Sequence, residues 1–283
     1  MSEQKNRVVW LASYPKSGNT WIRLFLASYL ATDQKINPNE ALRGSYHDAV
    51  SATMQKLLGV DVTAVDNQVV AALRLPYLRK LAENGKHDIL VKTHVVNGVW
   101  NDAAMIPASV TRRAIYIVRH PFDIAVSFAK HYGLSLDETV QAMGNPNFAI
   151  GSDNQVRQPL HTWSKHVDSW CEEPGSYPSL ILRYEDLQDR PALSFANLVR
   201  FMGLKLDFQQ LQRALDMTAF SNLKKFEKEN GFKEESDHNK GEFFGHGRAG
   251  KGLEILSQAQ KGRLAKDHAE TMSRLGYGVD GSY

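Results

Sequence analysis

A lysine, a glycine and several hydrogen-bonding side chains lie together near the start of the chain, in a pattern that could bind an anion. The apolar run Val8–Ala12 is followed by Ser13-Tyr-Pro-Lys-Ser-Gly-Asn-Thr-Trp21. A glycine-containing turn that enters a helix presents free N–H groups and the positive end of the helix dipole. Lys16 adds a full positive charge, and the serine, asparagine and threonine after it add donors. The pattern predicts a phosphate- or sulfate-binding loop, and the alternative is an ordinary turn with a surface lysine.

This loop matches the Walker A motif of P-loop nucleotide-binding proteins only in part. Walker A consists of glycine, four residues and then Gly-Lys-Ser/Thr, whereas here Lys16 precedes Gly18. Asp186, which follows the apolar run Leu180–Leu182, could act as the carboxylate that holds magnesium in such proteins. The inverted order of lysine and glycine argues against this kinase-like interpretation.

A histidine and an arginine each follow a further apolar run. Ile89-Leu-Val-Lys-Thr-His94 ends in a histidine, whose near-neutral pKa suits it to take a proton from a hydroxyl. Ala114–Val118 runs into Arg119, whose planar guanidinium fits phosphate oxygens. Ser127 lies eight residues after Arg119. The alternatives are a structural histidine, an ion pair between Arg119 and Asp123, and an ordinary polar residue at position 127.

The elements that must position these residues alternate along the chain. Four apolar runs predict buried strands. Amphipathic segments between and after these runs predict helices. The helices are expected after Thr20, after Pro121, from the capping box Ser135–Glu138 to Met143, around Trp163–Trp170, over Leu193–Met202 and over Ser257–Leu275. Alternating strands and helices favour an α/β fold with a central parallel sheet flanked by helices. In such sheets ligands bind beyond the carboxyl ends of the strands, where the lysine, histidine and arginine lie.

Length and composition set further bounds. The 283 residues, which contain no linker-like stretch, suit one domain, with a helical insertion at about 33–85 and a mobile loop at about 224–252. The net charge of +3 argues little for nucleic acid. The single cysteine, Cys171, and the lack of an apolar run of roughly 20 residues predict a cytoplasmic protein without a membrane span.

The order of these motifs resembles that of a known family. Tyr14-Pro-Lys-Ser-Gly-Asn-Thr-Trp21 is similar to the 5′-phosphosulfate loop of the cytosolic-type sulfotransferases, and Lys92-Thr-His94 and Arg119–Ser127 are similar to two further motifs of that family. The resemblance covers Val8 to about Gly276. It implies a P-loop-like three-layer fold and transfer of a sulfuryl group from 3′-phosphoadenosine-5′-phosphosulfate (PAPS), with 3′-phosphoadenosine-5′-phosphate (PAP) as product and no metal.

The resemblance also implies a role for each matching residue. His94 would be the general base, and Lys16 and Lys92 would stabilise the transferring group. The 5′-phosphate would contact Ser17, Gly18, Asn19 and Thr20, and the 3′-phosphate would contact Arg119 and Ser127. Trp21, Tyr184, Thr218 and Phe220 would contact the adenine, although Trp21 could equally pack in the core. Arg248 and Gly250 match the loop that closes on the 3′-phosphate, but Ala249 replaces its usual lysine, and the usual Gly-Asp-Trp is missing.

Two other functions remain as alternatives: a small-molecule P-loop kinase and a non-catalytic nucleotide-binding module. A kinase would require ATP and magnesium, and simple binding would not need a base such as His94. Among sulfotransferases, the membrane-anchored carbohydrate enzymes fit poorly with the predicted absence of a membrane span. The acceptor is expected to be a small molecule with a hydroxyl or an amine, and the oligomeric state stays open.

Overall fold

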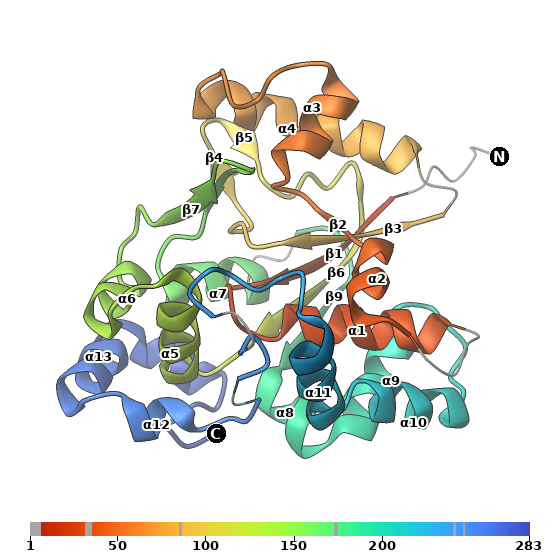
Figure 1. Cartoon of the computed structure of the whole chain (residues 1–283). Coiled ribbons are helices and arrows are strands. Elements are labelled where there is room, and N and C mark those ends of the chain that lie inside the picture. The colour runs from red at the N-terminus through yellow and green to blue at the C-terminus, as the bar shows by residue number, and fades with distance from the viewer. Residues whose placement is uncertain (1–6, 32–35, 85–86, 173–174, 240–241, 246) are drawn as a thin grey trace. The chain divides into compact units, whose positions relative to one another are not determined.

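Five strands form a sheet with the order β2–β3–β1–β6–β9 in the computed structural model (Figure 1). The structure describes residues 7–31, 36–84, 87–172, 175–239, 242–245 and 247–283. β1 and β2 each pair in parallel with β3, with Val8 opposite Ile89 and Tyr46 opposite Val91. The strands are β1 (Val8–Ser13), β2 (Tyr46–His47), β3 (Ile89–Thr93), β6 (Thr111–Val118) and β9 (Ser179–Arg183).

The predicted α/β fold with a central parallel sheet is confirmed. Each apolar run predicted as a strand is one, extended by one to three residues at its ends. β2 was not predicted, because two residues are too few to show a strand pattern. Two hairpins were also missed: β4 (Val99–Trp100) with β5 (Ala103–Ala104), and β7 (Ala149–Ser152) with β8 (Gln155–Pro159).

The chain passes back and forth between two compact units. The first contains the sheet, except for the last two residues of β6 and of β9, and comprises Met1–Tyr14, Ser45–Tyr116 and Gly144–Ile181. The second comprises Pro15–Gly44, Ile117–Met143 and Leu182–Tyr283. The one-domain organisation stays a prediction.

Three longer helices belong to the first unit. They are α3 (Ser51–Leu58), α4 (Asn67–Glu83) and α7 (Trp163–Cys171). α3 packs against α4, and the core of this unit includes Trp10, Tyr77 and Trp163, whose side chains are fully buried. The expected helical insertion at 33–85 therefore contains helices, but it also contains strand β2 of the main sheet.

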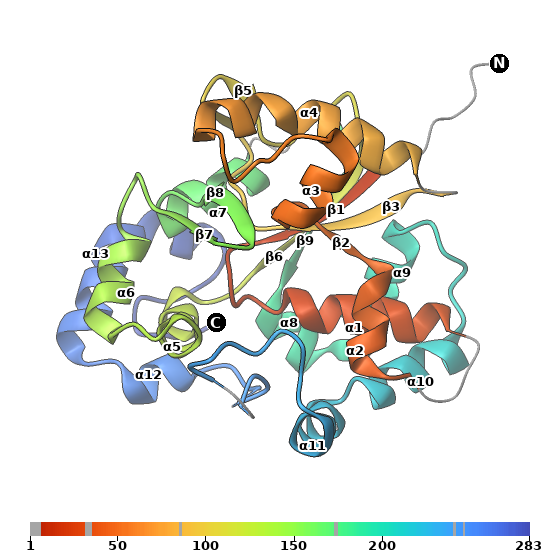
Figure 2. The same cartoon turned by 45° about the horizontal axis from the view of Figure 1, so that its top comes forward.

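The second unit is almost entirely helical. Its helices are α1 (Asn19–Leu30), α2 (Pro38–Ala41), the 3₁₀ turn η1 (Leu42–Gly44), α5 (Pro121–Tyr132), α6 (Leu136–Met143), α8 (Tyr184–Asp189), α9 (Pro191–Phe201), α10 (Phe208–Met217), α11 (Phe220–Asn230), α12 (Lys251–Ile255) and α13 (Gln258–Arg274). α12 and α13 lie beside α5 and α6 in both views (Figures 1 and 2). Because α11 continues to Asn230, the long loop expected at 224–252 begins only after that residue.

Candidate active site

The predicted anion loop joins β1 to α1, and its backbone has an unusual conformation. Lys16 and Gly18 both have positive φ angles, of 70° and 106°. A Cβ atom on Gly18 would lie 2.6 Å from Cδ2 of Tyr184, so a side chain at position 18 would be both strained and blocked. Gly18 is also the N-cap of α1 and has no side chain to bond the first N–H groups of the helix. The loop and the helix N-terminus together suit an anion.

Two side chains of the loop add to this anion site. The Ser17 hydroxyl is buried and has no hydrogen-bond partner in the described part of the chain. An unbonded buried hydroxyl costs about 1–3 kcal/mol, which a ligand oxygen would recover. The Lys16 ammonium lies 4.3 Å from the centre of the Phe243 ring, a distance at which the ring face attracts a cation.

The first turn of α1 is connected to Glu234, in the loop that follows α11. The Thr20 hydroxyl donates to the Glu234 carboxylate at 2.5 Å, and the Arg23 guanidinium contacts the same carboxylate at 2.6 Å. Arg23 also donates to the side chain of Asn19 at 3.1 Å. Sequence reasoning missed Arg23 and Glu234, which lie 211 positions apart and belong to no local motif.

Arg119 makes contacts with four parts of the second unit. Its guanidinium lies 4.2 Å from the centre of the Tyr184 ring, donates to the Lys16 carbonyl at 3.2 Å and contacts the Asp123 carboxylate at 3.4 Å. It also donates to the Arg248 carbonyl at 3.4 Å. Its Nε is buried without a hydrogen-bond partner among the described residues. The predicted anion loop and the predicted phosphate-binding arginine therefore lie together.

The ion pair between Arg119 and Asp123, which was the alternative role for Arg119, is therefore present. Asp123 also accepts hydrogen bonds from the predicted closing loop. Its two carboxylate oxygens accept from the backbone N–H groups of Gly250, at 2.9 Å, and of Gly252, at 2.7 Å. A Cβ atom on Gly252 would meet the backbone of Phe122 at 2.3 Å. Glycine at 252 thus lets the loop lie against the start of α5, whereas a larger side chain would be excluded.

The other residues predicted to contact the cofactor each have different neighbours in the structure. Trp21 packs edge-on against Tyr184, with ring centres 5.9 Å apart, and Phe220 belongs to the same apolar cluster as Trp21. Thr218 is buried and donates to the Ala214 carbonyl at 2.7 Å. Ser127 is half-buried on α5, one turn after Asp123. The Arg248 side chain is mostly exposed, and its guanidinium pairs with Glu254 at 2.8 Å.

His94 and Lys92 belong to the first unit, at the end of β3. Nδ1 of His94 lies 2.8 Å from the Ser13 carbonyl oxygen, which can only accept, so this nitrogen carries the proton and donates. The lone pair is therefore on Nε2, as a base requires. Burial, followed by the charge of Lys92, lowers the pKa of His94 well below its usual value of 6.5. His94 is thus a neutral imidazole around neutral pH.

A buried ion pair supports the strand that carries Lys92 and His94. The Asp48 carboxylate accepts from the Arg74 guanidinium at 2.5 Å and from the Thr93 hydroxyl at 2.7 Å. Thr93 stands between the two predicted catalytic residues, so this contact fixes the end of β3. No local sequence signal predicts this ion pair, because residues 48, 74 and 93 come from separate elements.

Neither a membrane-spanning helix nor a cluster of three potential metal ligands occurs within the ranges that the structure describes. The expectation that no metal takes part stays a prediction.

Comparisons with known proteins agree with one another. The sulfotransferase domain family matches residues 6–276. Dog sulfotransferase 1B1 is 26% identical over an alignment of 278 residues, and the match covers 93% of this chain and 82% of the relative. Mouse sulfotransferase 1 family member D1 is 24% identical over 270 residues, with 93% and 83% covered.

Solved structures share the fold at lower identity. Mouse sulfotransferase SULT7A1, complexed with PAP, has a TM-score of 0.63 at 18% identity, with 95% of this chain and 86% of that chain covered. Retinol dehydratase, in a complex with retinol and PAP, has a TM-score of 0.63 at 17% identity, with 95% and 82% covered.

Proposed function

Because the chain belongs to the sulfotransferase domain family, we propose that it transfers a sulfuryl group from PAPS to a hydroxyl or amine of a small-molecule acceptor. The observation that carries the choice of donor is the Ser17 hydroxyl, which is buried without a described partner beside a lysine and a helix N-terminus. Such a group suits a multiply charged anion. Two relatives of similar fold are complexes with PAP.

The residues of the second unit would hold PAPS. Ser17, Gly18, Asn19 and Thr20 are assigned to the 5′-phosphate, and Arg119 and Ser127 to the 3′-phosphate. The buried Nε of Arg119 supports its assignment to the 3′-phosphate, because this donor has no acceptor among the described residues. Trp21, Tyr184, Thr218 and Phe220 are assigned to the adenine. Gly250 would contribute its backbone, while the Arg248 side chain would have to leave Glu254 before it could act.

PAPS, when bound, supplies the sulfuryl group. His94 would take the proton of the acceptor at Nε2, since Nδ1 is already bonded to Ser13. Lys16 and Lys92 would stabilise the negative charge that develops on the transferring and leaving groups, in an in-line displacement. Cytoplasmic location and the absence of a metal requirement remain part of the proposal.

Calorimetric titration with PAP, run beside ATP with magnesium, tests the donor. We expect tight binding of PAP and little binding of ATP. Binding of ATP but not of PAP would favour the P-loop kinase, and would remove the roles given to Arg119 and Ser127.

Turnover of a His94→Ala variant would then separate catalysis from simple nucleotide binding. Loss of turnover with unchanged PAP affinity is expected for a general base, whereas a non-catalytic module would show no turnover even in the parent protein.

A further inference from the structure

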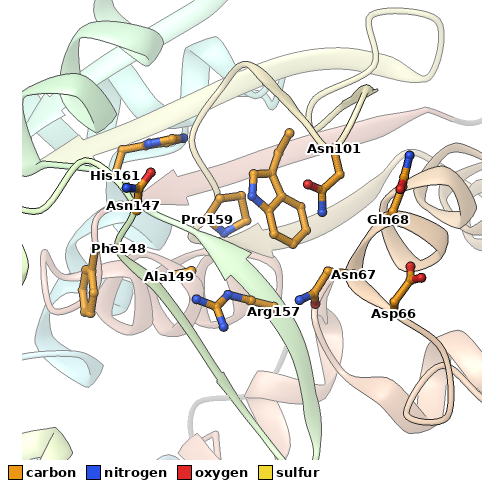
Figure 3. Close-up of a pocket in the computed structure, with 11 residues that line it drawn as sticks. Asp66, Asn67, Gln68, Asn101, Asn147, Phe148, Ala149, Arg157, Pro159 and His161 are labelled. Atoms are coloured by element: carbon orange, nitrogen blue, oxygen red, sulfur yellow. The ribbon is translucent and has the colours of Figure 1, made fainter.

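A cavity of about 500 Å³ lies in the first unit (Figure 3). It is bordered by the first turn of α4, by the turn between β4 and β5, and by the β7–β8 hairpin with the residues next to it. The side chains that give the cavity its character are Asn67, Asn101, Asn147, Arg157, Trp100 and Phe148. These side chains combine three asparagine amides and a cation with two aromatic rings.

Arg157 is an exposed cation without an ion pair in the described part of the first unit (Figure 3). The acidic lining residue, Asp66, is the N-cap of α4 and accepts from the backbone N–H of Val69 at 2.9 Å. That carboxylate is therefore engaged by its own helix. The guanidinium remains available for an anionic group, which it can bind through two parallel hydrogen bonds.

The three asparagine amides add groups that both donate and accept hydrogen bonds. An apolar ligand that covered them would leave their hydrogen bonds unmade, at a cost of about 1–3 kcal/mol for each group. Hydroxyl groups of a ligand would satisfy them instead. Trp100 and Phe148 offer ring faces, which suit the C–H groups of a hydroxylated ring.

A backbone hydrogen bond connects this cavity to the predicted base. The Pro159 carbonyl, in the cavity wall, accepts from the N–H of Val96 at 2.9 Å. Val96 comes two residues after His94, and two residues of extended chain span at most roughly 7 Å. The backbone of His94 therefore lies close to the wall of this cavity.

We propose that the cavity binds the part of the acceptor remote from the reacting hydroxyl, and that this part is rich in hydroxyl groups and carries a carboxylate. The inference rests on the proposed function, because it assigns the cavity to the acceptor of that reaction. It also distinguishes this chain from the retinol dehydratase complexes, which contain the apolar compounds retinol and androsterone.

A matched pair of glycosides tests the proposal. 4-Nitrophenyl β-D-glucuronide and 4-nitrophenyl β-D-glucoside differ in a carboxylate that replaces a hydroxymethyl group. Their affinities for the PAP-saturated protein would be measured by ligand-observed NMR titration. We expect the glucuronide to bind about tenfold more tightly, because only it can make the charge-assisted contact with Arg157. Arg157→Gln should bring the two affinities to within about twofold, with the glucoside unchanged.

Arg79→Gln provides the matched control, since Arg79 is an exposed arginine of the same unit near the other end of α4. It removes the same charge and should leave the tenfold preference intact. Equal affinities in the parent protein, an equal loss in both variants, or no binding of either glycoside would each overturn the inference. Failure of PAP itself to bind would instead refute the proposed function.

Discussion

Replacement of Arg119 by glutamine gives the sharpest test of the proposed 3′-phosphate site. The side chain is only 11% exposed, and its buried Nε has no described partner. A hydrogen bond to a charged group contributes about 1.5–3 kcal/mol. Since each 1.4 kcal/mol changes a dissociation constant tenfold, the affinity for PAP should fall by about 10- to 150-fold.

The assay compares PAP with adenosine 5′-monophosphate, which lacks the 3′-phosphate, by calorimetric titration of both proteins. The parent should prefer PAP, and Arg119→Gln should remove most of that preference while the affinity for the monophosphate changes little. Arg190→Gln is a suitable control, because it breaks an exposed arginine–aspartate pair of the same unit.

An equal loss for PAP and the monophosphate would refute the assignment. Arg119 also contacts Asp123, the Tyr184 ring and two backbone carbonyls. A residue that merely held these groups together would weaken both nucleotides alike. The ratio of the two affinities therefore separates a phosphate contact from a structural role.

Two further predictions concern His94 and Gly18. Burial, followed by the charge of Lys92, lowers the pKa of His94 below its usual 6.5. The imidazole therefore stays neutral as the pH falls to 6.5, and kcat/KM should decline only below pH 6.5. A pH–rate profile with its acid limb at or above pH 6.5 would contradict this prediction. Gly18→Ala should lower the free energy of unfolding by about 1–3 kcal/mol and weaken PAP binding, because of the positive φ angle and the Tyr184 ring. Gly59→Ala is the control, because Gly59 also has a positive φ angle, of 71°, but has open space around the added methyl group. If both variants gave similar results in denaturant unfolding and PAP titration, the steric argument would be wrong.

The sequence was most informative where apolar runs and capping signals were strong. The runs at residues 8–12 and 114–118 became β1 and β6, and Ser257 caps α13 with a complete capping box. These signals are local, since each depends on neighbours within a few residues. α11 was missed over residues 224–230 because its lysines and glutamates resemble those of a solvated loop.

Contacts between distant residues could not be predicted in this way. One missed element, the β4–β5 hairpin, did have a local signal. Its turn, Asn101–Asp102, has two positive φ angles, and an asparagine followed by an aspartate favours such a turn. No comparable signal marks the Asp48 ion pair with Arg74, because such a contact depends on how separate elements pack. The site motifs were found by their order along the chain, while the partners that orient them became visible only in the structure.

The carboxylate of Glu234 has a consequence for how a nucleotide would enter. It occupies the Thr20 hydroxyl and the Arg23 guanidinium, which belong to the helix end assigned to the 5′-phosphate. An incoming phosphate would therefore exchange with an internal anion rather than with water alone. The measured affinity would report the difference between two anions that compete for the same donors.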